Sequence, residues 1–205
     1  MASVSVASTT HAGGMRRHIL DSALQLFTSN GYFNTSIHDI QREAGISIGS
    51  IYNHFGGKEG IAKALYHDLL EQIDALVDQV TEDSDTAYAR GRALVTALFE
   101  LTEQDPVSVR FILNAKHREF LPDEPPICSA KPFVKLRDIV NQGILSGEIR
   151  DMDAWVAAAC AFGPALRMIT LRLDEVLPYS LDGFADRVWD SAWLALRNGS
   201  GVELG

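Results

Sequence analysis

Side chains with hydrogen-bonding groups are concentrated in the stretch 47–54: they are Ser47, Ser50, Tyr52, Asn53 and His54. All are short or planar, which suits direct contact with the donors and acceptors on the edges of nucleic-acid bases. If the stretch is helical, the apolar side chains at positions 46, 51 and 55 lie on the other side. The chemistry that this pattern predicts is recognition through hydrogen bonds on one face of a short helix.

The polar stretch lies in the second of two short predicted helices. Thr35 or Ser36 is suited to cap the first helix, which ends at Gly45, and Ser47 is suited to cap the second. A periodic apolar pattern predicts a preceding helix at 16–29. Two short helices joined by a tight turn form a helix-turn-helix, whose second helix enters the major groove of DNA.

Residues at the helix starts of this segment are candidates for contact with DNA phosphates. Thr35 and Ser36 would supply hydroxyls and backbone N–H groups, and Lys58 would supply an ammonium group. Gly49 and Ser50 leave room for close backbone approach. The alternative is that these are ordinary capping residues of a small helical protein.

At these positions the sequence resembles the TetR family of bacterial transcriptional regulators. The residues that match the family pattern are Thr35, Ser36, Asp39, Ile40, Ala44, Gly45, Ser47, Gly49, Ile51, Tyr52, His54, Phe55 and Lys58. The resemblance implies a set of residues at or near DNA: Thr35, Ser36, Ser47, Gly49, Ser50, Tyr52, Asn53, His54 and Lys58. Ile48 and Gln41 depart from the residues that are common in the family.

The resemblance also has implications for the partners. It implies a homodimer on a double-stranded DNA operator, and a second domain that binds a small-molecule effector and forms the dimer. The distribution of charge agrees with this division, because residues 1–66 carry five basic and four acidic side chains, whereas the remainder carries 13 basic and 23 acidic ones. An acidic body repels phosphate, so the N-terminal part is the candidate DNA surface.

The predicted fold class is all-α, with about nine helices. Residues 1–14, which carry no charged side chain, are expected to be a disordered leader; 15–66 form the helix-turn-helix head; and 67–205 form a larger helical domain for ligand binding and dimerisation. Six helices are expected from residue 58 onward: 58–80, 86–104, 106–121, 131–146, 152–173 and 181–197. The sequence shows neither a signal peptide nor a membrane-length apolar run, so we expect a cytoplasmic protein with no membrane partner.

Two of these predicted helices, 152–173 and 181–197, are apolar on more than one side. Such helices must be covered on two sides, which fits a position at the interface between the two subunits of a homodimer. The alternative is a well-buried monomer core.

A mostly apolar effector pocket is also expected in the body. Arg110, Asn114 and His117 share one face of the predicted helix 106–121, where the charged end of a ligand could dock, although a solvated row of side chains fits the spacing too. A kink at Gly163–Pro164 would open a cavity beside Phe162. The residues predicted to line the pocket are Phe111, Asn114, His117, Trp155, Phe162 and Arg167.

Enzymatic function is not expected. The sequence contains no nucleophile elbow, phosphate-binding loop or zinc-protease motif, so we assign no catalytic residues, metal ligands or cofactors. The leading hypothesis is a repressor that leaves a palindromic operator when an apolar small molecule binds. The alternatives are a ligand-independent architectural or activator protein that binds DNA and a helical-bundle enzyme.

Overall fold

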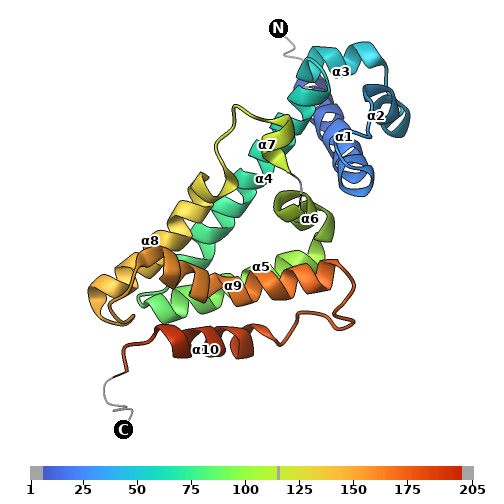
Figure 1. Ribbon diagram of the computed structural model, residues 1–205. Coiled ribbons are helices and arrows are strands. Elements are labelled where there is room, and N and C mark those ends of the chain that lie inside the picture. Colours follow the sequence, from blue (N-terminus) through green and yellow to red (C-terminus); the bar gives the residue numbers. More distant parts are fainter. Residues whose placement is uncertain (1–6, 115, 200–205) are drawn as a thin grey trace, which may run out of the picture. The chain divides into compact units, whose positions relative to one another are not determined.

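The computed structural model describes residues 7–114 and 116–199, which form ten α-helices and one short 3-10 helix (Figure 1). The helices are α1 (Ala7–Asn30), α2 (Ile37–Ala44), α3 (Ile48–Phe55), α4 (Lys58–Thr81), α5 (Ala87–Gln104), α6 (Pro106–Asn114), α7 (His117–Phe120), η1 (Ile127–Ser129), α8 (Lys131–Ser146), α9 (Ala154–Leu173) and α10 (Ala185–Leu196). In these ranges, extended backbone pairs only at an isolated bridge between Ile149 and Arg197. The all-α prediction is confirmed.

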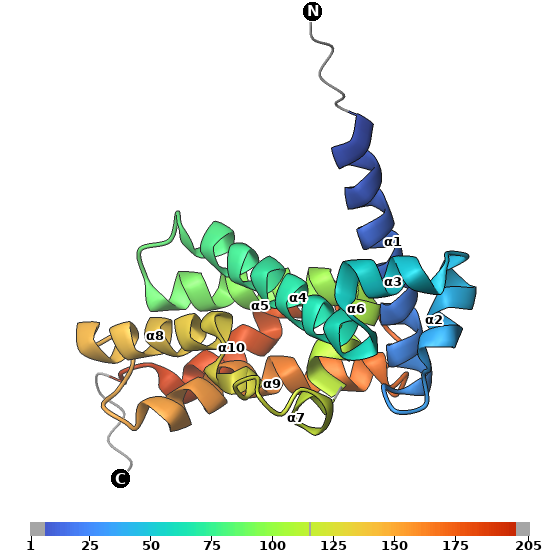
Figure 2. The ribbon, with the colours of Figure 1, turned by 90° about the horizontal axis from the view of Figure 1, so that it is seen from above.

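The first helix begins earlier than the sequence suggested. α1 starts at Ala7 and so includes residues 7–14, where the sequence predicts a disordered leader; residues 1–6 lie outside the described part of the chain. No proline occurs between residues 7 and 30, which allows the backbone hydrogen bonding of the helix to continue towards the N-terminus. In Figure 2 these first turns extend past α2 and α3.

The prediction of a single helix at 106–121 is wrong. α6 ends at Asn114 and α7 begins at His117, because Lys116 takes a non-helical backbone conformation (φ −79°, ψ 67°). The interruption turns the His117 side chain into the interior of the molecule. Arg110, Asn114 and His117 therefore do not form one row on a continuous helix.

The chain divides into two compact units. The first contains residues 1–69 and 107–125, and the second contains 70–106 and 126–205. α6 and α7 are thus grouped with the three N-terminal helices, although the sequence placed 107–125 in the second domain. α4 contributes its first half to one unit and its second half to the other.

The core of the first unit is built from the apolar faces of its short helices. Ile19, Ala23 and Phe27 of α1 are buried, as are Ile40 of α2 and Ile51 of α3. The same periodicity that predicted these helices therefore selects their inward faces. The packing of these three helices leaves one side of α3 in the core and the other side in solvent.

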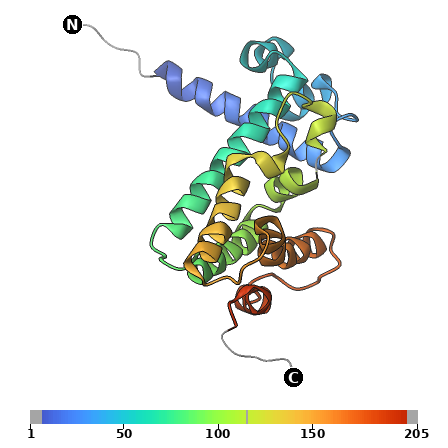
Figure 3. The ribbon, with the colours of Figure 1, turned by 60° about the vertical axis from the view of Figure 1, so that its left-hand side comes forward.

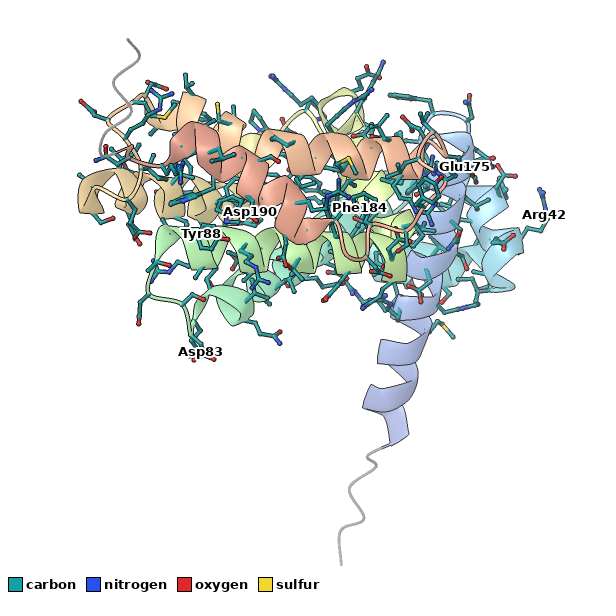
Figure 4. All side chains as sticks on the ribbon, turned by 90° about the horizontal axis from the view of Figure 1, so that it is seen from below. Arg42, Asp83, Tyr88, Glu175, Phe184 and Asp190 are labelled. Atoms are coloured by element: carbon teal, nitrogen blue, oxygen red, sulfur yellow. The ribbon has the colours of Figure 1, made fainter. Side chains whose placement is uncertain are left out.

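In the second unit, α10 packs on α9 and α5, and Trp189 fills the space between them. Gly91 of α5 allows this close approach, because a Cβ there would lie 2.0 Å from the Trp189 ring. The Tyr88 hydroxyl of α5 also donates to a carboxylate oxygen of Asp190 on α10, at 2.7 Å (Figure 4). α8 runs beside the second half of α4 (Figure 3), where Lys135 pairs with Asp74 and Asp78, each at 2.6 Å.

α9 is unusually apolar for a long helix of this chain. Among the described helices it is the one long and apolar enough to cross a membrane by length and composition alone. One side of it, including Ala157, Ala161 and Ile169, is buried within the second unit. Packing against α8 and α10 accounts for the apolar residues on that side.

Candidate DNA-binding site

α2 is held at its N-terminus by a reciprocal cap. The Ser36 hydroxyl accepts a hydrogen bond from the Asp39 backbone N–H at 3.1 Å, and the Asp39 carboxylate accepts one from the Ser36 N–H at 2.9 Å. The Ser36 hydroxyl also donates to Asp39, which lowers the pKa of that carboxyl group. Asp39 therefore stays ionised, and this capping box fixes where α2 begins.

The turn between α2 and α3 is equally well defined. Gly45 ends α2 in the left-handed conformation (φ 62°), which glycine adopts without a steric penalty. Ser47 then caps α3, its hydroxyl accepting from the Ser50 backbone N–H at 3.2 Å. Both caps lie where the sequence pattern placed them, and they fix the position of α3 relative to α2.

α3 presents its polar residues to solvent. Tyr52 is 53% exposed and Asn53 and His54 are also exposed, whereas Ile51 on the opposite side is completely buried. The exposed groups are donors and acceptors on a rigid short helix, the arrangement that reads base edges in a major groove. Gly49 is exposed at the beginning of the same helix, and half-buried Ser50 directs its hydroxyl to the sulfur of Met15 on α1.

Thr35 has a different role from the one expected. Its side chain is 1% exposed, and its hydroxyl donates to the carbonyl oxygens of Gly31 (2.9 Å) and Leu26 (3.2 Å). The hydroxyl therefore ties the loop before α2 to the end of α1. Ser36, by contrast, is exposed at the start of α2, but its hydroxyl and its backbone N–H both donate to Asp39. Asp39 is therefore the anion at this helix N-terminus, and a phosphate contact would require the Ser36 hydroxyl to turn away from it.

Lys58, at the first position of α4, is partly withdrawn from solvent. Its ammonium group donates to the Tyr32 carbonyl at 3.0 Å and lies 4.1 Å from the centroid of the Tyr32 ring. Burial lowers the pKa of this lysine. Lys58 thus links the end of α1 to the start of α4, and a phosphate contact would require its side chain to turn outward.

Sequence reasoning missed two residues that hold α3 and α4 together. Gly60 of α4 lies so close to α3 that a Cβ would be 1.8 Å from the Phe55 carbonyl oxygen. Arg16 of α1 pairs with Asp68 of α4 at 3.0 Å, and its guanidinium lies 5.6 Å from the Phe55 ring centroid. A glycine in the first turn of a helix was the available signal for the first contact; the second is a long-range contact without a local signature.

The two departures from the family pattern lie beside this surface. Ile48, at the start of α3, and Gln41 of α2 are both half-buried. Arg42 projects from α2 into solvent (Figure 4) and pairs with Asp39 at 3.4 Å. The surface therefore carries few cations, and its polar groups are mainly uncharged.

Residues 19–65 match the family model described as bacterial regulatory proteins, tetR family. The N-terminal helices are similar to those of the TetR family. The match covers the helices that form and orient the candidate DNA-binding surface.

Curated relatives and solved structures extend the similarity to the rest of the chain. The fatty acid metabolism regulator protein of Bacillus subtilis is 25% identical over 83% of this chain and 89% of its own length. The transcriptional repressor KstR2 of Mycobacterium tuberculosis is 28% identical over 67% of this chain and 71% of its own. The crystal structure of FadR from Bacillus subtilis in complex with stearoyl-CoA has a TM-score of 0.73, with 24% identity, over 87% of this chain and 98% of that chain.

The residues predicted to line an effector pocket lie in both units. In the first unit, Phe111 and Asn114 line a pocket of about 370 Å³, while His117 is buried between the rings of Tyr66 and Phe111. Burial lowers the pKa of His117, whose Nε2 lies 3.4 Å from the Ile112 carbonyl oxygen.

The other three predicted pocket residues are in the second unit and on different sides of α9. Trp155 is exposed and its ring lies 4.2 Å from the Arg137 guanidinium, Phe162 is buried and stacked on Trp189, and Arg167 is exposed. No group of three or more potential metal ligands occurs among the described residues.

Proposed function

We propose that this protein is a transcriptional repressor of the TetR family that binds a palindromic operator as a homodimer in the cytoplasm. The observation that carries the proposal is the exposed polar face of α3, held by caps at both ends. Tyr52, Asn53 and His54 would contact bases, Ser47 and Gly49 would allow close approach, and Ser36 would contact phosphate. This arrangement supports direct reading of sequence, since the exposed groups carry hydrogen-bonding specificity and little charge.

Dimerisation is proposed through the outer faces of α9 and α10. Val156 and Ala159 of α9 and Leu194 and Ala195 of α10 are exposed in the single chain, with Leu194 at 63%. Exposed apolar residues on two adjacent helices support a self-complementary helical seam. Two heads held by such a seam would contact two half-sites at a set spacing.

The dimer proposal is tested by replacing Leu194 with Glu and measuring mass by light scattering. The charged side chain is expected to produce a monomer at micromolar concentration, because an unpaired carboxylate in an apolar seam is costly to desolvate. Leu145→Glu on α8, at a leucine that is more exposed still (80%), is the control and should remain dimeric. A dimeric Leu194→Glu variant would place the seam elsewhere.

The effector is proposed to be an acyl-CoA thioester. This rests on the relatives, since one is named a fatty acid metabolism regulator and a solved FadR holds stearoyl-CoA. A ligand weakens operator binding only if it favours one state of the dimer over another, and typical coupling of about 1–3 kcal/mol corresponds to about 5–150-fold. Stearoyl-CoA should therefore release operator DNA in a polarisation assay, whereas free coenzyme A should not.

The DNA-binding proposal is tested by selecting binding sites from random duplexes. Tyr52→Ala and His54→Ala should lose sequence selectivity while keeping a helical circular-dichroism spectrum. Tyr179→Ala removes an exposed tyrosine from the second unit and serves as the matched control. If both α3 variants select the same sites as the unmodified protein, α3 is not the reading helix. If selection is specific but no acyl-CoA affects it, the ligand-independent regulator becomes the better hypothesis.

A further inference from the structure

Met15 of α1 presents an oxidisable sulfur at the surface of the first unit. The residue is 39% exposed, whereas Met152 and Met168, the other methionines in the described ranges, are half-buried in the second unit. An accessible thioether is open to oxidation to the sulfoxide, and reductases reverse that reaction. Among the methionines that the structure describes, Met15 is therefore the most accessible to a small oxidant.

The Met15 sulfur contacts the helix that is proposed to read the operator. The Ser50 hydroxyl of α3 donates a hydrogen bond to this sulfur at 3.1 Å, although the two residues are 35 positions apart in the sequence. Ser50 lies in the first turn of α3, two residues before the exposed Tyr52. The contact therefore places an atom that oxidants can change beside the side chains proposed to contact bases.

The hydrogen bond to Met15 is one that Ser50 can exchange for a bond to DNA. A thioether sulfur is a weak acceptor, so the hydroxyl can turn from it to a base edge or a phosphate oxygen at little cost. The Ser50 backbone N–H is already held by the Ser47 hydroxyl at 3.2 Å, which leaves the side-chain hydroxyl as the group that can move. In the unoxidised protein this hydroxyl is available to the operator.

Oxidation of Met15 would change the contact in two ways. Peroxide transfers one oxygen atom to the thioether: the O–O bond breaks, an S–O bond forms, the sulfur loses two electrons and the peroxide is reduced to water. The polar sulfoxide oxygen would hold the Ser50 hydroxyl more firmly than the thioether does. It also needs space, because an O–H···O hydrogen bond alone spans about 2.7–2.8 Å, nearly the whole 3.1 Å that now separates the sulfur from the hydroxyl oxygen.

We propose that Met15 is a site of reversible oxidation at which peroxide weakens operator binding. The inference rests on the proposed function, because it requires α3 to read the operator. The sulfoxide would withdraw the Ser50 hydroxyl from DNA and would displace either the Met15 side chain or the first turn of α3. The expected loss of operator affinity is about fivefold, which corresponds to one typical hydrogen bond.

The test measures operator affinity of the full-length protein by fluorescence polarisation before and after treatment with hydrogen peroxide. Peptide mass spectrometry follows the addition of oxygen at each methionine, and Met15 should be oxidised before Met168. Affinity should fall about fivefold in step with the Met15 sulfoxide. Methionine sulfoxide reductase with dithiothreitol should restore the affinity, whereas dithiothreitol alone, which reduces disulfides or sulfenic acids of Cys128 and Cys160, should not.

Variants locate the oxidation site, and each is compared with itself before and after peroxide so that a change in its basal affinity does not enter. Met15→Leu keeps an apolar side chain of similar size and should lose the response to peroxide. Met168→Leu is the matched control and should keep the response. Ser50→Ala should respond more weakly, because the sulfoxide then has no hydroxyl to hold.

Two results would overturn the inference while leaving the proposed function intact. One is an operator affinity that stays unchanged when Met15 is fully converted to the sulfoxide. The other is a Met15→Leu variant that loses as much affinity on oxidation as the unmodified protein does. Absence of specific DNA binding before any oxidation would instead refute the proposed function, and this inference with it.

Discussion

Gly60→Ala tests whether α3 is oriented by its contact with α4. In an open helical position, alanine would stabilise the protein by up to about 1 kcal/mol relative to glycine. At this position the new Cβ would instead lie 1.8 Å from the Phe55 carbonyl oxygen, whereas contacts below 3.0 Å are essentially not seen for real Cβ atoms. The obstructing atom belongs to the backbone at the end of α3, so a side-chain rotation cannot relieve the collision. α3 or α4 must move by more than about 1 Å, and overpacking of this kind typically costs about 1–3 kcal/mol.

The expected net loss of about 1–2 kcal/mol corresponds to a melting temperature lower by roughly 2–8 °C for a chain of this size. Operator affinity, measured by fluorescence polarisation, should fall at a temperature where the variant is still folded, because α3 would be displaced from its position beside α4. Gly14→Ala in α1 is the matched control, since nothing lies within 4 Å of its Cβ position, and it should not lower the melting temperature. If Gly60→Ala melts and binds like the unmodified protein, α3 and α4 do not pack as described.

Three other substitutions probe polar groups that are buried or half-buried. Burial lowers the pKa of His117 below its ordinary value of 6.5, so between these two pKa values the unfolded chain binds more protons than the folded chain. The free energy of unfolding should therefore decrease as the pH falls from 6.5 towards the pKa of the folded state. Urea titrations should show a smaller decrease for His117→Phe. Thr28→Val removes a buried hydroxyl that has no hydrogen-bond partner and should raise the free energy of unfolding by about 1 kcal/mol. A lower free energy of unfolding would show that the hydroxyl does have a partner. Glu103 accepts hydrogen bonds from Arg172 at 2.9 Å and from the Leu181 N–H at 2.9 Å, so Glu103→Gln should speed amide exchange at Leu181; an unchanged rate would show that another contact holds this loop.

The local structure of the candidate DNA-binding site was predictable from the sequence. Ser36 and Ser47 cap α2 and α3, and Gly45 forms the turn between them, because caps and left-handed turns depend on neighbouring residues only. The periodic apolar residues also identify the buried face of each short helix. The exposed position of Tyr52 follows from the same pattern, since the residue before it, Ile51, faces the core.

Other features depended on contacts between residues far apart in the sequence. The Thr35 hydroxyl can cap a helix or bond to a carbonyl, and the carbonyl oxygens of Gly31 and Leu26, presented together at the end of α1, decide for the second. Lys58 could equally extend into solvent, but the Tyr32 ring and carbonyl at the end of α1 hold it. In both cases the polar group has alternative partners of similar energy, and the tertiary arrangement selects one.

Which residues meet in a pocket was likewise decided by the tertiary structure. Sequence reasoning placed Arg110, Asn114 and His117 in one helical row, but the break before α7 buries His117 among aromatic rings, whereas Arg110 and Asn114 line a pocket with residues of α1. Helical periodicity specifies the direction of a side chain only while the helix continues. The sequence by itself thus determined α2, α3 and their caps. The break between α6 and α7 and the partners of the polar side chains depended on contacts with parts of the chain that are distant in sequence.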